Sequence, residues 1–267
     1  MSEISLPRST SPRNPRISDA SLSVLLPVGL AVFVLVAWQI GAKVSGISPV
    51  ILPAPSDILA SYNGIVGDLA HQSVATGSEA FFAFFLSCFF GLITALVLSS
   101  SVILFETFYP NLVVFQIIPK IALAPLFTFW LGIGATSRLS YAVFISFFPV
   151  ALATMTGLSR ADAGALRLCR AAGATRWQTF FHVQIPYSLP YFFSGAKVAA
   201  TLSIIGIVIG EFISANEGLG YFILRAQSYG QTSKIFASLS VLCGLGLLLY
   251  VLPVQGERML RKWWRGS

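Results

Sequence analysis

Six long apolar segments, separated by shorter polar ones, dominate the pattern of hydrophobic and polar positions along the chain. They cover approximately residues 21–42, 80–101, 109–131, 139–158, 193–212 and 235–255. A helix needs about 20 apolar residues to cross a bilayer, and these segments lack the strict alternation of membrane β-barrel strands. The pattern therefore predicts an all-α membrane protein with six transmembrane helices.

The composition agrees with this class of protein. Of the 267 residues, 55% are hydrophobic and only 10% are charged, whereas soluble domains carry about 25% charged residues. The net charge of +7 does not indicate nucleic-acid binding, because the basic residues lie at the ends of apolar segments rather than together on a soluble face. The three cysteines have no metal-ligand spacing and are expected to be packing residues.

The basic residues at the segment ends predict how the chain lies in the membrane, because short cytoplasmic segments are enriched in Lys and Arg. The tail before the first apolar segment, the segment after the last one and the connection between the fourth and fifth are all basic. Both termini are therefore expected in the cytoplasm. The expected organisation is a disordered tail (1–20), a first transmembrane helix (21–45), an outer loop (46–77), a five-helix core (78–257) and a basic tail (258–267).

The polar connection 159–190 is too long for a simple link between neighbouring helices. Asp162 is placed to cap a helix, and Gly173 with Ala174 permits a bend. After the bend, four residues recur at the spacing of one helix face, which predicts a second helix with an aromatic stripe: Trp177, Phe180, Phe181 and Gln184. Pro186 and Pro190 are expected to end this second helix before the fifth span. Periodicity alone leaves two interpretations: an interfacial helix under the lipid headgroups, or a helix that enters a groove on a cytosolic partner.

The same connection resembles the cytoplasmic signature of ABC importer permeases, which reads E-A-A, three residues, G, nine residues, I-x-L-P. Gly173 occupies the glycine position, and after nine residues the closing positions are filled by Val183, Gln184, Ile185 and Pro186. The first half departs from the signature. Arg167 stands at the glutamate position, and the next positions hold Leu168, Cys169, Arg170, Ala171 and Ala172. An arginine there is suited to pair with an acidic surface on the partner.

Three further stretches extend the resemblance over roughly residues 50–260. They are ILPAPSDIL (51–59), IIPKIALAPLFTFWLGIG (117–134) and NEGLGYFILRAQ (216–227), and they resemble the nitrate, sulfonate and taurine branch of these permeases. The resemblance implies a type I ABC importer permease bundle, in which 78–257 is the permease core and 159–190 is a loop with a coupling helix. The residues it assigns to ATPase coupling are Arg167, Arg170, Ala171, Ala172, Gly173, Ala174, Trp177, Phe180, Ile185 and Pro186.

The resemblance also implies an assembly in the bacterial inner (plasma) membrane. Its expected members are two copies of the permease as a homodimer, two ABC ATPase subunits and an extracytoplasmic solute-binding protein, surrounded by membrane lipid. The chain has no G-x-x-x-x-G-K-[ST] loop for nucleotide phosphates. We therefore expect that the chain is not an enzyme and binds no cofactor, and that ATP and Mg²⁺ bind to the separate ATPase subunit.

Ionisable residues within the apolar segments are candidates for the transport pathway, because charge is costly at membrane depth. Lys120 lies between Pro119 and Pro125, which free backbone carbonyls. It either lines the pathway, where its charge suits an anionic solute, or pairs inside the bundle. Glu211 near the outer end of the fifth segment is either a residue of a gate or of a contact with the binding protein, or a water-exposed acid at a helix end. Gln116 and Pro119 complete the pathway candidates.

Two other charges lie at the ends of apolar segments. Lys197 is expected to extend its long side chain to the inner face. Glu79 is expected to be solvated at the outer boundary of the second segment.

The sequence thus predicts the permease of an ATP-driven importer for a small solute. The solute is a sulfonate, nitrate or taurine-like anion, or a pyrimidine, thiamine-precursor or aromatic compound. Two alternatives stay open: an ion-coupled secondary transporter that works alone, and a membrane anchor or assembly protein. The first alternative requires intramembrane acids for coupling, and Glu211 is its one candidate.

Overall fold

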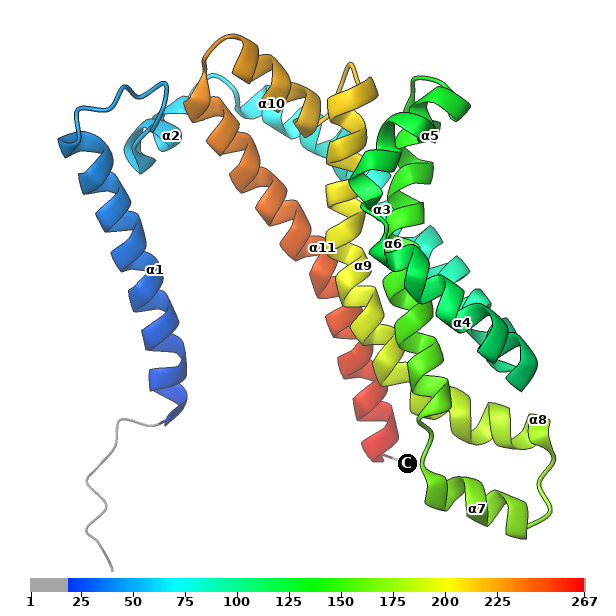
Figure 1. The fold of residues 1–267 in the computed structure, drawn as a ribbon. Coiled ribbons are helices and arrows are strands. Elements are labelled where there is room, and N and C mark those ends of the chain that lie inside the picture. Colours follow the sequence, from blue (N-terminus) through cyan, green and yellow to red (C-terminus); the bar gives the residue numbers. More distant parts are fainter. Residues whose placement is uncertain (1–18, 267) are drawn as a thin grey trace, which may run out of the picture.

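A computed structural model of the chain describes residues 19–266, and nearly all of the predicted tail 1–20 lies outside them. Within the described part every regular element is a helix (Figure 1). In chain order these are α1 Asp19–Val44, α2 Pro55–Ser61, α3 Val66–Ser99, α4 Val102–Ile117, η1 Lys120–Leu123, α5 Ala124–Leu131, α6 Ala135–Ser159, α7 Ala163–Ala171, α8 Arg176–Thr179, η2 Phe180–Gln184, α9 Ile185–Ser214, α10 Leu219–Ser228 and α11 Thr232–Gly266. The η1 segment is a 3₁₀ helix and η2 is a π-helical turn.

Five of these helices or continuous helical runs are long and apolar enough to cross a membrane, and a bent pair makes a sixth span. The prediction of six transmembrane helices is confirmed with that pair counted as one span. The expectation of a continuous third helix over 109–131 is wrong, because α4 and the segment η1–α5 are bent by 86°. The break lies at Ile118, which is extended (φ −58°, ψ 131°). A residue that precedes proline, here Pro119, is sterically disfavoured in the helical conformation.

The second span begins earlier than its apolar segment. α3 starts at Val66, whereas the hydrophobic pattern starts at residue 80, so the expected outer loop contributes a helical extension. Leu69 in this extension is 3% exposed and belongs to a cluster with Leu219 and Phe222 of α10. Burial against α10 therefore stabilises turns that a hydropathy window does not detect.

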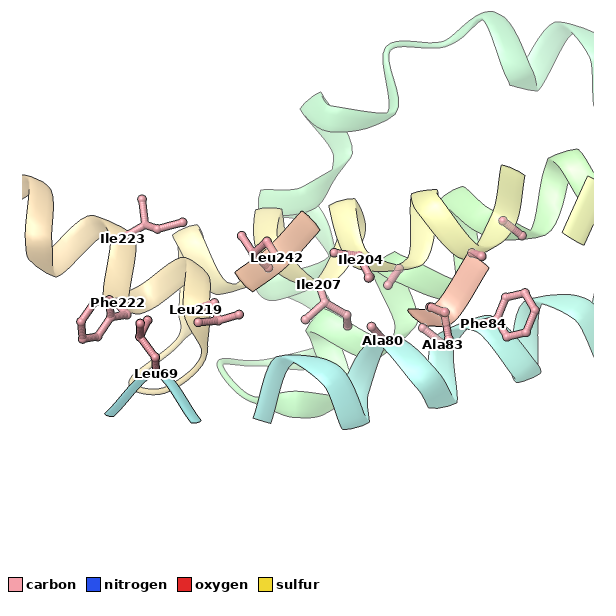
Figure 2. Packing of buried hydrophobic residues seen from close by; sticks show 14 of the residues in the cluster. Leu69, Ala80, Ala83, Phe84, Ile204, Ile207, Leu219, Phe222, Ile223 and Leu242 are labelled. Atoms are coloured by element: carbon pink, nitrogen blue, oxygen red, sulfur yellow. The ribbon is translucent and has the colours of Figure 1, made fainter. Parts of the chain in front are cut away.

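The core of the bundle is the crossing of α6 and α9, covered on one side by α3. Figure 2 shows the apolar side chains that α3, α9, α10 and α11 bring together, among them Ala80, Phe84, Ile207 and Leu242. The helices α6 and α9 approach closely where small residues meet. A Cβ on Gly195 would lie 2.6 Å from the Pro149 carbonyl oxygen, and a Cβ on Gly206 would lie 2.7 Å from the Cα of Ala142. Small residues allow this backbone contact between membrane helices.

Helix α1 lies at the side of the bundle (Figure 1) and is attached through α2 and through Trp38, whose ring lies 5.4 Å from that of Phe236 on α11. Lys43 pairs with Asp57 at 3.3 Å, and Gln39 donates to the Ser56 hydroxyl at 3.0 Å. The Asp57 carboxylate also accepts from the backbone N–H of Ala54. That hydrogen bond, with a smaller contribution from Lys43, lowers the pKa of Asp57 below its usual value.

The last helix continues through the predicted basic tail, since α11 ends at Gly266. Its inner part is tied to α9 by an ion pair between Lys197 and Glu257 at 2.5 Å, and Arg261 also pairs with Glu257. Lys197 therefore has a partner within the bundle, where the sequence predicts a side chain extended to the inner face. The described start of α1, the end of α11 and the α7–α8 segment lie at the same end of the molecule (Figure 1).

Candidate coupling loop and membrane pathway

The first helix of the loop 159–190 is α7, and its start is fixed by a side-chain cap. The Asp162 carboxylate accepts from the backbone N–H of Ala165 at 2.7 Å, which confirms the predicted cap. Arg167 and Arg170 lie on the surface of this helix, and each Nε donates to a carbonyl one turn earlier. Leu168 between them is 71% exposed. The helix therefore presents two cations and an apolar side chain to its surroundings.

The predicted bend at Gly173 is present. Gly173 has φ +74°, a conformation that costs residues with a Cβ roughly 1–2 kcal/mol. Its N–H donates to the Arg170 carbonyl at 3.1 Å, and the Ala174 N–H donates to the Cys169 carbonyl at 2.9 Å. These two bonds form a Schellman motif, which satisfies the last carbonyls of α7 and reverses the chain.

A new helix starts directly after the bend. Thr175 and Gln178 form a reciprocal capping box at the start of α8: the Gln178 N–H donates to the threonine hydroxyl, and the Thr175 N–H donates to the glutamine carbonyl oxygen. The helical run then passes through η2 into α9 and spans residues 176–214 without interruption.

The expectation that Pro186 and Pro190 end the second helix is wrong. Pro186 lies in the first turn of α9, where its missing N–H is tolerated, and Pro190 lies inside that helix. Just before them the run widens to a π-turn, in which the Ile185 N–H reaches the Phe180 carbonyl. Such a turn changes the local hydrogen-bond register and accommodates the altered backbone. The loop is thus joined to the fifth span by helix rather than by a flexible connection.

The aromatic stripe of the loop is divided between two surfaces. Phe180 is 7% exposed and packs with Met155 and Leu158 of α6. Ile185 is partly buried against the same cluster. Trp177, in contrast, is 62% exposed and stacks on Phe181, so it is available to a partner.

The structure therefore brings the predicted coupling residues onto one projecting hairpin. Six of them, all exposed, surround the bend or flank it: Arg167, Arg170, Ala171, Ala172, Gly173 and Trp177. The other four are half-buried or buried and connect the hairpin to the bundle: Ala174, Phe180, Ile185 and Pro186.

Lys120 lies at the break between α4 and α5. Its ammonium group donates to the Gln116 carbonyl at 2.8 Å and lies 5.4 Å from the centre of the Phe148 ring. The Gln116 carbonyl is free because the helix ends before the N–H of Lys120 could reach it. This contact is the predicted pairing of the lysine with a carbonyl freed near Pro119. Gln116 and Pro119 are exposed, and Lys120 is half-buried.

Glu211 lies elsewhere, in a buried polar network at the outer end of the bundle. It is 2% exposed, which excludes the interpretation as a water-exposed acid. Its carboxylate accepts from the Thr76 hydroxyl at 2.6 Å and from the Gly220 N–H at 2.7 Å. The Leu219 N–H in turn donates to Thr76 at 2.8 Å. Glu211 thus fixes the turn between α9 and α10 against α3.

An ion pair beside this network is a feature that sequence reasoning missed. The guanidinium group of Arg138 on α6 donates to the Glu79 carboxylate on α3 through Nε at 3.0 Å and through Nη2 at 2.5 Å. Its third nitrogen, Nη1, donates to the Ser214 carbonyl at 3.4 Å. Arg138 is only 5% exposed, so Glu79 is a paired residue and not a solvated boundary acid. The available signal was that each residue directly precedes an apolar segment at the predicted outer side.

Comparison with known proteins gives these features a family context. The family model described as "binding-protein-dependent transport system inner membrane component" matches residues 87–259, which include the coupling hairpin, Lys120 and Glu211. The match covers more than half of the chain. The chain belongs to this family of transport permeases.

Curated permeases match almost the entire chain. The formylaminopyrimidine transport permease protein ThiX of Halalkalibacterium halodurans is 32% identical over 244 residues, which are 91% of this chain and 97% of ThiX. The riboflavin transport system permease protein RibX of Chloroflexus aurantiacus is 34% identical over 240 residues, 89% of each chain. The taurine transport system permease protein TauC of Escherichia coli is 26% identical over 250 residues, 91% of each chain.

Solved structures show the same fold. An inward-facing structure of the MetNI methionine ABC transporter superposes with a TM-score of 0.59 at 23% identity, and the match covers 73% of this permease and 95% of that chain. The predicted fold class, a helical ABC importer permease bundle, is thereby confirmed.

The permease is the membrane-spanning subunit of an ABC importer, in the branch that includes sulfonate and taurine permeases. Membership in this family implies a separate ATPase and a solute-binding protein as partners, and a place in the inner membrane. A secondary transporter that works alone and a membrane anchor are not favoured.

Proposed function

We propose that two copies of the permease form one translocation pathway, with one ATPase docked on the coupling hairpin of each copy. ATP and Mg²⁺ would be held by the ATPases, and the permease itself would carry no cofactor and no catalytic residue. The solute-binding protein would deliver cargo to the outer face formed by residues 43–79 and 213–234. Both termini would lie in the cytoplasm, which agrees with the described start of α1 and end of α11 lying at the same end of the molecule as the hairpin.

The observation that carries this proposal is the unbroken helical run from the hairpin into the fifth span. Because α8, η2 and α9 are continuous over residues 176–214, a displacement at Trp177 is transmitted along the helix. Phe180 anchors the same run to α6 through Met155 and Leu158. Closure of the ATPases would therefore move α6 and α9 together and rock the bundle between inward-open and outward-open states.

For the transported solute, we propose a small nitrogen heterocycle of the pyrimidine or flavin class. The support is that permeases named for formylaminopyrimidine and riboflavin are 32% and 34% identical to this chain, whereas those named for taurine and aliphatic sulfonates are 26–27% identical. A sulfonate, nitrate or taurine-like anion is the second candidate, favoured by the ammonium group of Lys120. The neighbouring Gln116 and Pro119 are exposed at the same helix break and would line the pathway with it.

The function is tested by uptake into proteoliposomes that contain the permease, its ATPase and its binding protein. We expect ATP-dependent uptake of a labelled aminopyrimidine in preference to taurine, and no uptake when the ATPase is omitted. Uptake that persists without the ATPase would contradict the assignment as an ATP-driven importer.

A variant of Lys120 separates the pathway from assembly in the same assay. Lys120→Met is expected to reduce uptake by about tenfold or more, because it removes an ammonium group that can donate to a ring nitrogen or oxygen of the heterocycle, and a hydrogen bond from a charged group contributes about 1.5–3 kcal/mol. The matched control Lys120→Arg keeps the charge and most of the uptake. Co-purification of the ATPase should be the same for both variants. Normal uptake by Lys120→Met would remove this residue from the pathway.

A further inference from the structure

A cleft of about 670 Å³ separates the coupling hairpin from the α3–α4 turn. One wall is the turn itself, and the other wall is contributed by α7, α8 and η2. In Figure 1 the lower end of α4, which follows this turn, lies above α8. The lining residues with hydrogen-bonding or charged side chains include Ser99, Ser100, Ser101, Arg170, Arg176 and Thr179.

The cleft carries a positive charge that has no acidic partner among its lining residues. Arg170 and Arg176 are both exposed, and none of the described residues that line the cleft is a carboxylate. Arg176 makes no side-chain ion pair in the described part of the chain. Glu106 lines an adjoining hollow of about 230 Å³, which shares Ser99, Ser101, Val102 and Gln184 with the cleft. Guanidinium groups of this kind bind phosphate oxygens well.

The serine run opposite the arginines has unused hydrogen-bonding capacity. The Ser99 hydroxyl is buried and finds no hydrogen-bond partner within residues 19–266. Ser101 is the N-cap residue of α4, and its side chain makes no capping bond. The Ser99 hydroxyl is enclosed by protein, whereas the hydroxyl of Ser101 lines the cleft and can donate to an acceptor oxygen of a ligand there.

The cleft lies beside the end of the α3 span, which is at Ser99, and lipid headgroups are expected at the end of a span. Two large aliphatic side chains border the cleft with high exposure: Val102 is 69% exposed and Ile103 is 76% exposed. Exposed aliphatic residues beside a polar cleft suit acyl chains.

We propose that this cleft binds the headgroup phosphate of an anionic phospholipid. Arg170 and Arg176 contact the phosphate, the hydroxyl of Ser101 donates to one of its oxygens, and the acyl chains lie against Val102 and Ile103. The lipid lies between the coupling hairpin and the α3–α4 turn. This site is independent of the solute pathway and of the solute class; it shares Arg170 with the residues proposed for ATPase docking, whereas Arg176 belongs to the cleft alone.

The test is native mass spectrometry of the full-length permease titrated with phosphatidylglycerol or phosphatidylcholine. We expect tighter binding of phosphatidylglycerol to the unchanged chain. The double variant Arg170→Gln/Arg176→Gln is expected to weaken that binding by about tenfold or more, since each basic residue near an anionic lipid contributes about 1 kcal/mol. The matched control Arg160→Gln/Arg167→Gln removes two arginines of the same loop that do not line the cleft, and it should bind as the unchanged chain does.

Ser101→Ala provides a variant that keeps every charge of the cleft. It should weaken phosphatidylglycerol binding by a few-fold and leave the thermal unfolding midpoint unchanged, because the Ser101 side chain makes no capping bond that the substitution would remove. A free anion is distinguished from a lipid by competition with inorganic phosphate at millimolar concentration. Displacement of the lipid by phosphate would overturn the headgroup assignment, as would equal binding of phosphatidylglycerol by the two double variants.

Discussion

At the scale of single residues, Lys120 and Glu211 are both ionisable groups in apolar segments, but their surroundings differ. Lys120 lies half-buried at a helix break and bonds one carbonyl. Glu211 is enclosed and bonds Thr76 and the N–H of Gly220. The ammonium group of Lys120 therefore lies near a surface, whereas the carboxylate of Glu211 links α3 to the α9–α10 turn. Sequence alone identified both residues as unusual and could not distinguish their roles.

The Glu79–Arg138 pair gives a residue-scale prediction. Glu79→Ala leaves the nearly buried Arg138 without its carboxylate, so we expect a loss of about 3 kcal/mol in the free energy of unfolding. The measurement is the thermal unfolding of the purified permease in detergent, with Ser78→Ala as the control at an adjacent exposed position. An unfolding midpoint equal to that of the control would show that the ion pair contributes no stability.

At the scale of elements, hydropathy predicted where spans exist better than where they begin, end or break. α3 starts at Val66, although the apolar segment starts only at residue 80. Hydropathy does not detect the first turns, because they bury only Leu69 and its neighbours against α10 and do not form a continuous apolar run. The break at Ile118 had a signal in Pro119, since a residue before proline avoids the helical conformation. The π-turn before Pro186 had a signal in that proline, but a proline does not tell whether the helix ends or widens to a π-turn.

The bend of the coupling hairpin was predictable from local chemistry, and it yields an element-scale prediction. A Cβ at Gly173 would meet no atom within 4 Å, so Gly173→Ala acts only through the backbone conformation. The positive φ costs alanine about 1 kcal/mol, which corresponds to about fivefold weaker association with the ATPase. Gly173→Asn is the matched control, because asparagine tolerates this conformation, and it should retain most of the affinity. Equal affinity of the alanine and glycine chains in a pull-down titration would contradict a role for the bend in docking.

At the scale of the whole molecule, one helical run connects the coupling hairpin to the buried polar network around Glu211. It begins at Arg176, passes the cluster around Phe180, pairs with α11 through Lys197 and ends beyond Glu211. Sequence predicted the two ends of this path, the docking stripe and the outer acid. The partners along it come from distant segments, so tertiary contacts were needed to show that hairpin and outer turn belong to one connected body.

The central claim is that this run transmits ATPase closure across the membrane, and distances between spin labels on the two copies of the assembled transporter test it directly. Labels are placed singly at the exposed positions Gln178 and Phe212, after replacement of the three free cysteines. When ATP binds, we predict that the distance between the two Gln178 labels shortens and that the distance between the two Phe212 labels changes in the same transition. A shortening at Gln178 without any change at Phe212 would show that the hairpin moves by itself and would contradict the account.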